Sequence, residues 1–167
     1  ERTKIEPPLT IADGLRVRIP GAGTFPVIQR HVRKVVLVTD AEMLDAIAFV
    51  GLGDVLNQPV GSLGAAERRL VEVARAVVGS PRLVLLDEPA AGLPEEETAA
   101  LGQVIKQIPD RTGALTILVD HDMELVGATC SHVAVLDFGI VIAHGPTQQV
   151  LDDPRVMAAY LGTEEVL

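Results

Sequence analysis

The feature that most constrains the fold is a short apolar run that ends in two acids and a proline. Residues 83–86 are Leu-Val-Leu-Leu, and Asp87-Glu88-Pro89 follows at once. A run of this length without polar alternation, bounded by turn residues, predicts a strand buried on both faces of a sheet. Residues 115–119 predict a second buried strand, which ends in Asp120-His121-Asp122. Two such strands with a helical pattern between them predict a parallel α/β sheet.

Helical patterns surround both strands. Thr39 and Glu42 have the spacing of a capping box, and the helix that they open stops at Gly51. A second helix is predicted over about 65–78, where apolar residues recur on one face. Pro94 and the three acids after it open the helix between the two strands. The remaining helices are expected after the second strand through Leu125, and near 148–151 and 155–161.

The final strands are expected to form a hairpin. Residues 133–136 and 140–143 are apolar and flank Asp137-Phe138-Gly139. This tripeptide also matches the kinase magnesium motif, but no glycine-rich loop, strand lysine or catalytic loop accompanies it, so a hairpin turn is the preferred interpretation. The order of elements predicts a mainly parallel sheet flanked by helices, with an antiparallel hairpin at its edge.

Charge divides the chain into two parts. Residues 1–34 hold seven of the 14 basic residues but only three of the 23 acids. Leu15, Val17 and Ile19 alternate with arginines there and predict a short strand. We therefore expect a basic segment of loop and strand over residues 1–38, and one acidic domain over residues 39–167.

Composition limits the class of function. The net charge of −9 and the 2% of aromatic residues argue against a nucleic-acid partner, because such partners require clustered cations and stacking surfaces. Cys130 is the single cysteine, so no internal disulfide can form, which fits a reducing compartment. No apolar run reaches the length of a membrane span. A cytoplasmic location is expected.

Polar residues at the two strand ends are candidates for chemistry. Adjacent parallel strands would bring Asp87-Glu88 and Asp120-His121-Asp122 to one edge, where α/β sheets bind ligands. A carboxylate there can hold Mg²⁺ through water, and its neighbour can orient a nucleophilic water. A histidine at the next strand tip can contact a transferred phosphoryl group. The acid pair alone is weak evidence, since acids before a proline are common at strand ends.

Four segments in one order give a stronger indication. Residues 62–76 resemble the signature helix of ABC transporter ATPases, and residues 83–88 resemble the Walker B strand of that family. Residues 91–94 occupy the place of the D-loop, and His121 occupies the place of the switch histidine. The resemblance covers residues 39–167 and is strongest to the ATPases of branched-chain amino-acid transporters. The segments most similar to those proteins are residues 86–93, 120–123 and 159–162.

The resemblance implies an ATPase subunit that uses ATP and Mg²⁺. Asp87 would hold the metal, Glu88 would act as general base on water, and His121 would contact the γ-phosphate. The subunit would pair head to tail with a second ATPase subunit, beneath a membrane permease at the inner face of the plasma membrane. Its transported solutes would be branched-chain amino acids or similar molecules. Residues that would bind ATP across the dimer seam are Leu63, Gly64, Ala65, Ala66 and Glu67 of the signature and Ala91, Gly92 and Leu93 of the D-loop.

The signature departs from the family pattern. The LSGGQ sequence becomes Leu-Gly-Ala-Ala-Glu over residues 63–67. The serine hydroxyl is lost at Gly64, a glycine becomes Ala66, and Glu67 puts a negative charge where phosphate should lie. Pro94 replaces the usual D-loop aspartate. Each change is expected to weaken the contact with ATP.

Nothing in the chain matches the P-loop pattern G-x-x-x-x-G-K-[ST]. Gly21-Ala22-Gly23-Thr24 has no lysine and is interpreted as a turn. Gln29 is a candidate for the Q-loop glutamine, although its surroundings do not match. The fold is therefore expected to be an incomplete P-loop NTPase, inactive as an isolated chain. The alternative is a degenerate module that does not hydrolyse ATP and serves in dimerisation or assembly.

Overall fold

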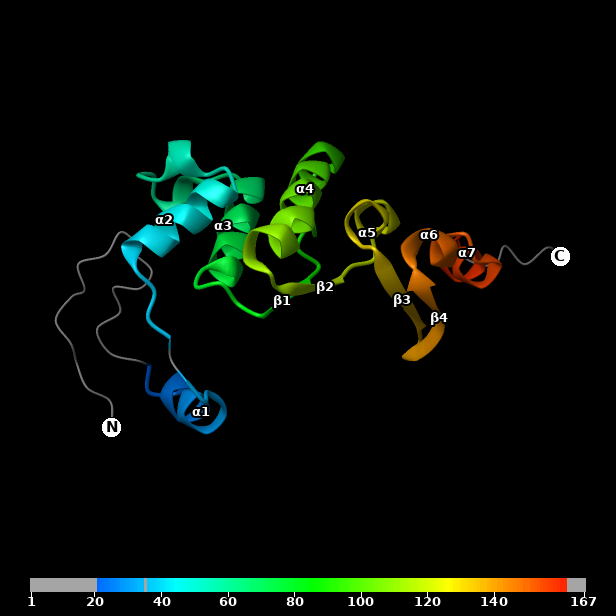
Figure 1. Ribbon diagram of the computed structural model, residues 1–167, viewed down its shortest axis with the longest axis horizontal. Helices are drawn as coiled ribbons and strands as arrows, with labels where there is room; N and C mark the ends of the chain where they lie inside the picture. Colours follow the sequence, from blue (N-terminus) through cyan, green and yellow to red (C-terminus); the bar gives the residue numbers. More distant parts are fainter. Residues whose placement is uncertain (1–20, 35, 162–167) are drawn as a thin grey trace.

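The computed structural model describes residues 21–34 and 36–161. Its elements are α1 (Thr24–His31), α2 (Asp40–Phe49), η2 (Gly53–Val55), η3 (Val60–Ser62), α3 (Ala65–Val77), β1 (Leu83–Asp87), α4 (Glu95–Thr112), β2 (Leu115–Val119), α5 (Met123–Thr129), β3 (His132–Asp137), β4 (Ile140–Pro146), α6 (Thr147–Leu151) and α7 (Pro154–Leu161). Figure 1 shows them along one long axis, with α2 and α3 towards one end, β1 and β2 central, and the β3–β4 hairpin with α6 and α7 at the other end. Within the described part of the chain, no helix combines the length and apolarity needed to cross a bilayer.

The helices begin where local signals predicted. The Thr39 hydroxyl accepts a hydrogen bond from the Glu42 N–H at 3.2 Å, and the Glu42 carboxylate accepts one from the Thr39 N–H at 2.7 Å. This reciprocal pair confirms the capping box at the start of α2. Helix α1 lies in the segment that the sequence suggested was loop and strand. The strand expected at residues 15–19 falls outside the described residues.

The two predicted central strands pair in parallel. Leu83 lies opposite Leu115, and Asp87 lies opposite Val119. Helix α4 connects the strands and ends at Gly113, whose φ of 72° is readily adopted only by a residue without a side chain. Buried side chains from α3, α4 and the strands form the main core. Its most buried members, each exposed by 2% or less, are Val50, Val73, Val84, Leu101, Ile108 and Ala114.

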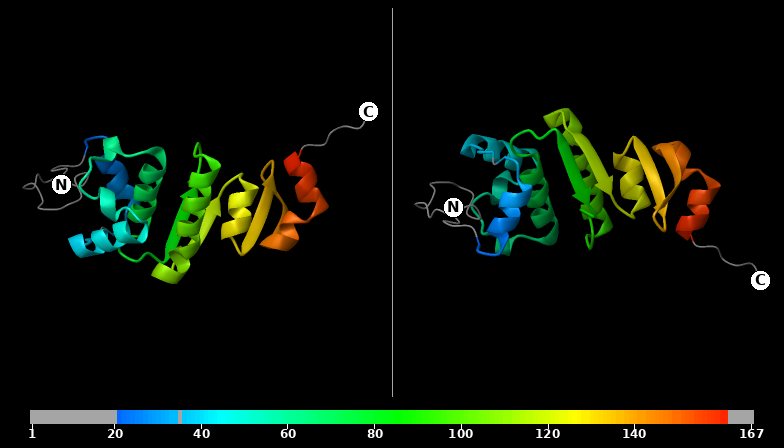
Figure 2. Two further views of the ribbon diagram at one scale, coloured as in Figure 1. Left: turned by 90° about the horizontal axis from the view of Figure 1, so that it is seen from above. Right: turned by 90° about the horizontal axis from the view of Figure 1, so that it is seen from below.

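Burial of the strands differs from the prediction. Val84 and Leu86 are 2% and 9% exposed, whereas Leu85 between them is 66% exposed. On β2, Ile117 is 45% and Val119 is 58% exposed. Seen from below in Figure 2, the strands face the viewer, with α4 behind them. The expectation of burial on both faces is therefore wrong: helices cover one face, and no element among the described residues covers the other.

The hairpin is present at the predicted place. Strands β3 and β4 pair antiparallel, with Asp137 opposite Ile140 and a turn at Phe138-Gly139. It forms a two-stranded sheet of its own, separate from the pair β1–β2. A small second core joins it to the last two helices through Ala143, Val150 and Val156.

Candidate functional site

The carboxyl ends of β1 and β2 bring the two predicted catalytic residues together. The Oε1 atom of Glu88 lies 3.3 Å from Nδ1 of His121. The Glu88 N–H donates to the Val119 carbonyl at 2.8 Å, which ties the residue after β1 to the last residue of β2. The two side chains are 54% and 79% exposed, so both can meet a ligand from solvent.

The backbone of Glu88 is in an uncommon conformation. Its φ of 44° lies in the left-handed region, which costs a residue with a side chain about 1–3 kcal/mol. Hydrogen bonds on both sides hold it there, because its carbonyl also accepts from the Ala91 N–H at 3.1 Å. Pro89 and Ala90 are buried next to it. The carboxylate is therefore aimed by a constrained turn rather than by a flexible loop.

A buried carboxylate supports His121. The Oδ1 atom of Asp120 accepts from the N–H groups of His121 at 2.8 Å and Asp122 at 3.0 Å, and it lies 3.7 Å from Nδ1 of His121. Its side chain is only 3% exposed, and its Oδ2 atom is buried without a hydrogen-bond partner. Sequence reasoning placed Asp120 in the polar cluster but gave it no task of its own. Its position between the end of a predicted strand and the histidine is the signal that could have identified it.

Asp122 fixes the direction in which the chain leaves the site. Its Oδ1 atom accepts from the N–H groups of Glu124 at 2.9 Å and Leu125 at 3.0 Å. This is the N-cap of α5, and it satisfies donors that the first turn of a helix leaves free. His121 is thus held between a strand and a capped helix.

Asp87 is the predicted metal ligand. It is the last residue of β1, and its side chain is exposed. Among residues 21–34 and 36–161, no cluster of three or more histidine, cysteine or acidic side chains could hold a metal. Mg²⁺ usually takes one or two carboxylates together with phosphate and water oxygens. Asp87 therefore suits Mg²⁺ as one oxygen ligand beside a nucleotide, and not as part of a cage made by the protein.

The signature residues lie at the start of α3. Gly64 is the N-cap, and its N–H donates to the Oε2 atom of Glu67 at 2.8 Å. Leu63 is 5% exposed and belongs to the packed interior, whereas Ala65 is exposed and Ala66 is half-buried. A carboxylate of the chain itself thus sits at the positive end of the helix, where an anion would otherwise bind.

The D-loop residues form a tight turn after β1. Gly92 has a φ of 80°, and Leu93 packs against the main core. Arg69 of α3 reaches the Ala91 carbonyl at 3.5 Å and forms an ion pair with Glu72 at 2.9 Å. This arginine joins the signature helix to the D-loop, and no motif had singled it out.

Gln29, the remaining candidate residue, lies away from this site. Gln29 is exposed on α1, and Figures 1 and 2 both place α1 apart from the two parallel strands. The structure therefore gives the proposed Q-loop role of Gln29 no support.

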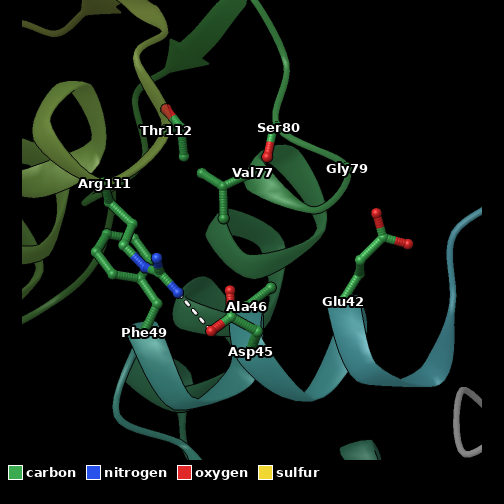
Figure 3. A pocket seen from close by; sticks show the side chains of 9 residues that line it. All are labelled: Glu42, Asp45, Ala46, Phe49, Val77, Gly79, Ser80, Arg111 and Thr112. Carbon is green, nitrogen blue, oxygen red and sulfur yellow. Dashed lines mark hydrogen bonds and ion pairs between the residues drawn. The ribbon is translucent and has the colours of Figure 1, made fainter.

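A small pocket lies elsewhere, between α2, α3 and α4 (Figure 3). Its volume is about 70 Å³, well below the roughly 300–1,000 Å³ of typical ligand sites. An ion pair between Asp45 and Arg111 crosses it. None of the predicted site residues lines it, and it is too small for a nucleotide. Its lining residues are Glu42, Asp45, Ala46, Phe49, Val77, Gly79, Ser80, Arg111 and Thr112.

Comparison with known proteins places the chain in a family. The family described as "ABC transporter" matches residues 3–91, which is more than half of the chain. A second family, described as "Branched-chain amino acid ATP-binding cassette transporter", matches residues 141–166. The first match begins before residue 39, so it includes most of the basic amino-terminal segment.

Two curated relatives are branched-chain amino acid transport ATP-binding proteins. BraF of Pseudomonas aeruginosa is 37% identical over 113 residues, which cover 68% of this chain and 44% of BraF. LivG of Escherichia coli is 34% identical over 126 residues, which cover 73% of this chain and 49% of LivG. The chain thus spans about half the length of the curated relatives that it matches.

A solved structure has the same fold. The ADP conformation of MJ1267, an ATP-binding cassette of an ABC transporter, superposes with a TM-score of 0.67 at 22% identity. The superposition covers 82% of this chain and 56% of that one. The helices, the parallel strand pair and the hairpin of this chain are therefore a portion of the ABC ATPase fold, as predicted. Together with the sequence matches, this shows that the chain belongs to the ABC transporter ATP-binding family.

Proposed function

We propose that the chain is the carboxyl-terminal portion of an ATP-hydrolysing subunit of an ABC transporter for branched-chain amino acids or similar solutes. The observation that carries this proposal is the contact between Glu88 and His121 at the ends of two parallel strands, 3.3 Å apart. The similarity to BraF and LivG supports the class of solute. The site would act at the cytoplasmic face of a membrane, with a permease and a second ATPase subunit as partners.

Each residue of the site has a separate role in ATP hydrolysis. The carboxylate of Glu88 accepts a proton from the attacking water, a step that typically contributes about 10²–10⁴-fold to a rate. His121 keeps the Glu88 carboxylate in place through Nδ1 and contacts an oxygen of the γ-phosphate with its other ring nitrogen. Asp120 positions His121 by accepting hydrogen bonds from the backbone N–H groups of His121 and Asp122. Asp87 would supply an oxygen ligand to Mg²⁺, and the metal would neutralise phosphate charge.

Residues 63–67 and 91–93 would form the second half of a composite site. They would meet the ATP held by the other subunit of a head-to-tail dimer, with the backbone N–H groups of the α3 N-terminus directed at the γ-phosphate. Glu67 opposes this contact because its carboxylate already accepts the Gly64 N–H. The same observation favours the second candidate function, a degenerate module that pairs with a competent subunit and does not itself complete a site.

A chimera tests the proposal. The 126-residue segment of E. coli LivG that matches this chain is replaced by the matched part of this chain, which is 73% of it, and ATP turnover is measured with the LivG transport partners present. We expect turnover, and we expect Glu88→Gln to reduce it by about 10²-fold or more, because the amide cannot accept the proton. The matched control is Glu97→Gln, at an exposed position in the first turn of α4.

Two results would contradict hydrolysis at this site. One is a folded chimera that assembles with its partners but turns over no ATP, which would support the degenerate module. The other is turnover that Glu88→Gln and Glu97→Gln leave equally unchanged. For the 167-residue chain alone, calorimetry should detect weak or no binding of MgATP, since its sequence contains no phosphate-binding loop.

A further inference from the structure

The segment that carries α1 is basic and contains no acid. Residues 14–39 hold five of the 14 lysines and arginines, together with His31, and no aspartate or glutamate. The whole chain has a net charge of −9, so this segment is a local exception. Its described lysine and arginine residues, which we call the cation cluster, are Arg30, Arg33 and Lys34, and all three are exposed. A basic segment within an acidic chain indicates an anionic partner.

The same segment exposes aliphatic side chains. Their exposed fractions run from 40% to 92%, in rising order for Ile28, Val32, Val27, Val36 and Leu37. Every residue of α1 is exposed except Phe25, which is half-buried. Single exposed aliphatic residues are ordinary, but five within residues 27–37 form a group, and such groups mark contact surfaces.

Helix α1 separates the two kinds of side chain. With about 3.6 residues per turn, Phe25 and Ile28 lie on one face, and Val32 at the C-cap follows at the same spacing. Arg30 lies on the opposite side of the helix. Figure 1 shows α1 set apart from α2, so α2 does not cover the apolar face. An apolar face beside clustered cations is typical of a helix that lies on a membrane surface.

The partner of this segment must supply anions and an apolar interior together. An acidic protein or a nucleic acid would pair with the cation cluster but leave the aliphatic side chains in water. An apolar protein surface would bury the cations without partners, which is costly. The surface of an anionic bilayer satisfies both groups. Aliphatic side chains enter the boundary of the acyl chains, while long cationic side chains extend to the headgroups.

We propose that residues 24–37 bind directly to the surface of a bilayer that contains anionic lipid. The aliphatic side chains enter the boundary between headgroups and acyl chains, and the cation cluster pairs with lipid phosphates. The contact lies on the surface, since no helix in the described part of the chain combines the length and apolarity needed to cross a bilayer. Three cations and a short apolar face make the binding reversible. This contact is separate from the site of Glu88 and His121.

Vesicle co-sedimentation provides the test. The complete 167-residue chain is mixed, without nucleotide, with vesicles of phosphatidylcholine alone or with vesicles that also contain phosphatidylglycerol. We expect about 100-fold stronger binding to the second kind. That binding should weaken by about tenfold or more when salt is raised from about 0.05 M to about 0.5 M, because salt screens the charges. Amide hydrogen exchange of α1 should slow on binding, and the amides of β1 and β2 are the internal reference.

A pair of triple variants tests the charge. The first removes the cation cluster by Arg30→Gln, Arg33→Gln and Lys34→Gln. It should lower the affinity for anionic vesicles by about 100-fold, at about fivefold for each cation. The matched control removes two arginines and one lysine that are exposed elsewhere, by Arg75→Gln, Arg82→Gln and Lys106→Gln. It has the same net charge as the first variant, and it should bind like the unaltered chain.

A second pair of triple variants tests the apolar contact. The first consists of Val27→Ser, Val36→Ser and Leu37→Ser, and it should weaken binding by about tenfold or more. The matched control replaces two valines and one leucine that are 53–63% exposed elsewhere, by Val60→Ser, Val141→Ser and Leu136→Ser. It should bind like the unaltered chain. All of the replaced side chains are exposed, so the four variants should keep the fold, which circular dichroism checks.

Several outcomes would overturn the proposal. These are the absence of binding, equal binding to both kinds of vesicle, and variants that bind no more weakly than their controls. Loss of binding in the charge variant alone would also overturn it, because it would mean adsorption by charge without insertion, which an acidic protein surface would equally give. Because the assay contains no nucleotide, failure of the chimera to hydrolyse ATP would leave membrane binding standing. Failure to bind vesicles would leave the chemistry of Glu88 to the chimera.

Discussion

The Nδ1 atom of His121 lies 3.3 Å from Oε1 of Glu88, at the ends of two strands that a long helix separates in the chain. The parallel register of β1 and β2 produces this contact, because Asp87 and Val119 lie opposite each other and the chain turns just beyond each of them. The backbone positions of the two residues are set by the pairing of the strands and not by the contact between the side chains. A variant that removes either side chain should therefore leave the backbone of the site in place.

Replacement of His121 should separate activity from stability. In the LivG chimera, we expect His121→Ala to lower ATP turnover by about 10²-fold, since both the phosphate contact and the partner of Glu88 are lost. The free energy of unfolding should change by less than about 0.5 kcal/mol, because the side chain is 79% exposed. His144→Ala, at an exposed position on β4, is the control and should retain turnover. Equal turnover in the two variants would mean that His121 takes no part in ATP hydrolysis.

Replacement of Asp120, unlike replacement of His121, should lower the stability of the isolated chain. Asp120→Ala leaves the N–H groups of His121 and Asp122 without their acceptor, and we expect a loss of about 1–3 kcal/mol in the free energy of unfolding by urea. Asp120→Asn keeps one acceptor oxygen and should lose less. If the two variants are equally stable, the two backbone hydrogen bonds do not hold this turn.

Much of the fold could be predicted from the sequence because its signals are local. The capping box at Thr39, the strand limits at residues 115–119 and the turn at Phe138-Gly139 each depend on a few neighbouring residues. The contact of Glu88 with His121 followed from one further assumption, that neighbouring strands pair in parallel. Open faces and free edges could not be predicted, because an uninterrupted apolar run has the same sequence whether one face or both are covered. The Arg69 contact with Ala91 depends on tertiary packing that no spacing encodes.

The capping box should make stability depend on pH. The backbone N–H of Thr39, and after it the Thr39 hydroxyl, lower the pKa of Glu42. A carboxyl whose pKa is lower in the folded state stabilises the fold above its unfolded pKa, and it loses that contribution as the pH falls through the folded value. The stability difference between the unaltered chain and Glu42→Gln should therefore be full at pH 7 and shrink below about pH 4.5. Urea unfolding at pH 7, 4.5 and 3 measures it, and a difference that does not change with pH would contradict the role of the charge.

The signature helix gives the last prediction, in which stability and ATP affinity move in opposite directions. The Glu67 carboxylate accepts the Gly64 N–H and places a negative charge at the positive end of α3. Glu67→Gln should therefore lower the free energy of unfolding by about 0.3–1 kcal/mol. In the chimera, the same change removes repulsion of the γ-phosphate across the dimer seam, and we expect the KM for ATP to fall by about two- to fivefold. Glu97→Gln, which also replaces an exposed acid in the first turn of a helix, is the matched control and should leave the KM unchanged. A KM that is the same in both variants would mean that the α3 N-terminus does not meet ATP, and the degenerate module would then be the better description of the chain.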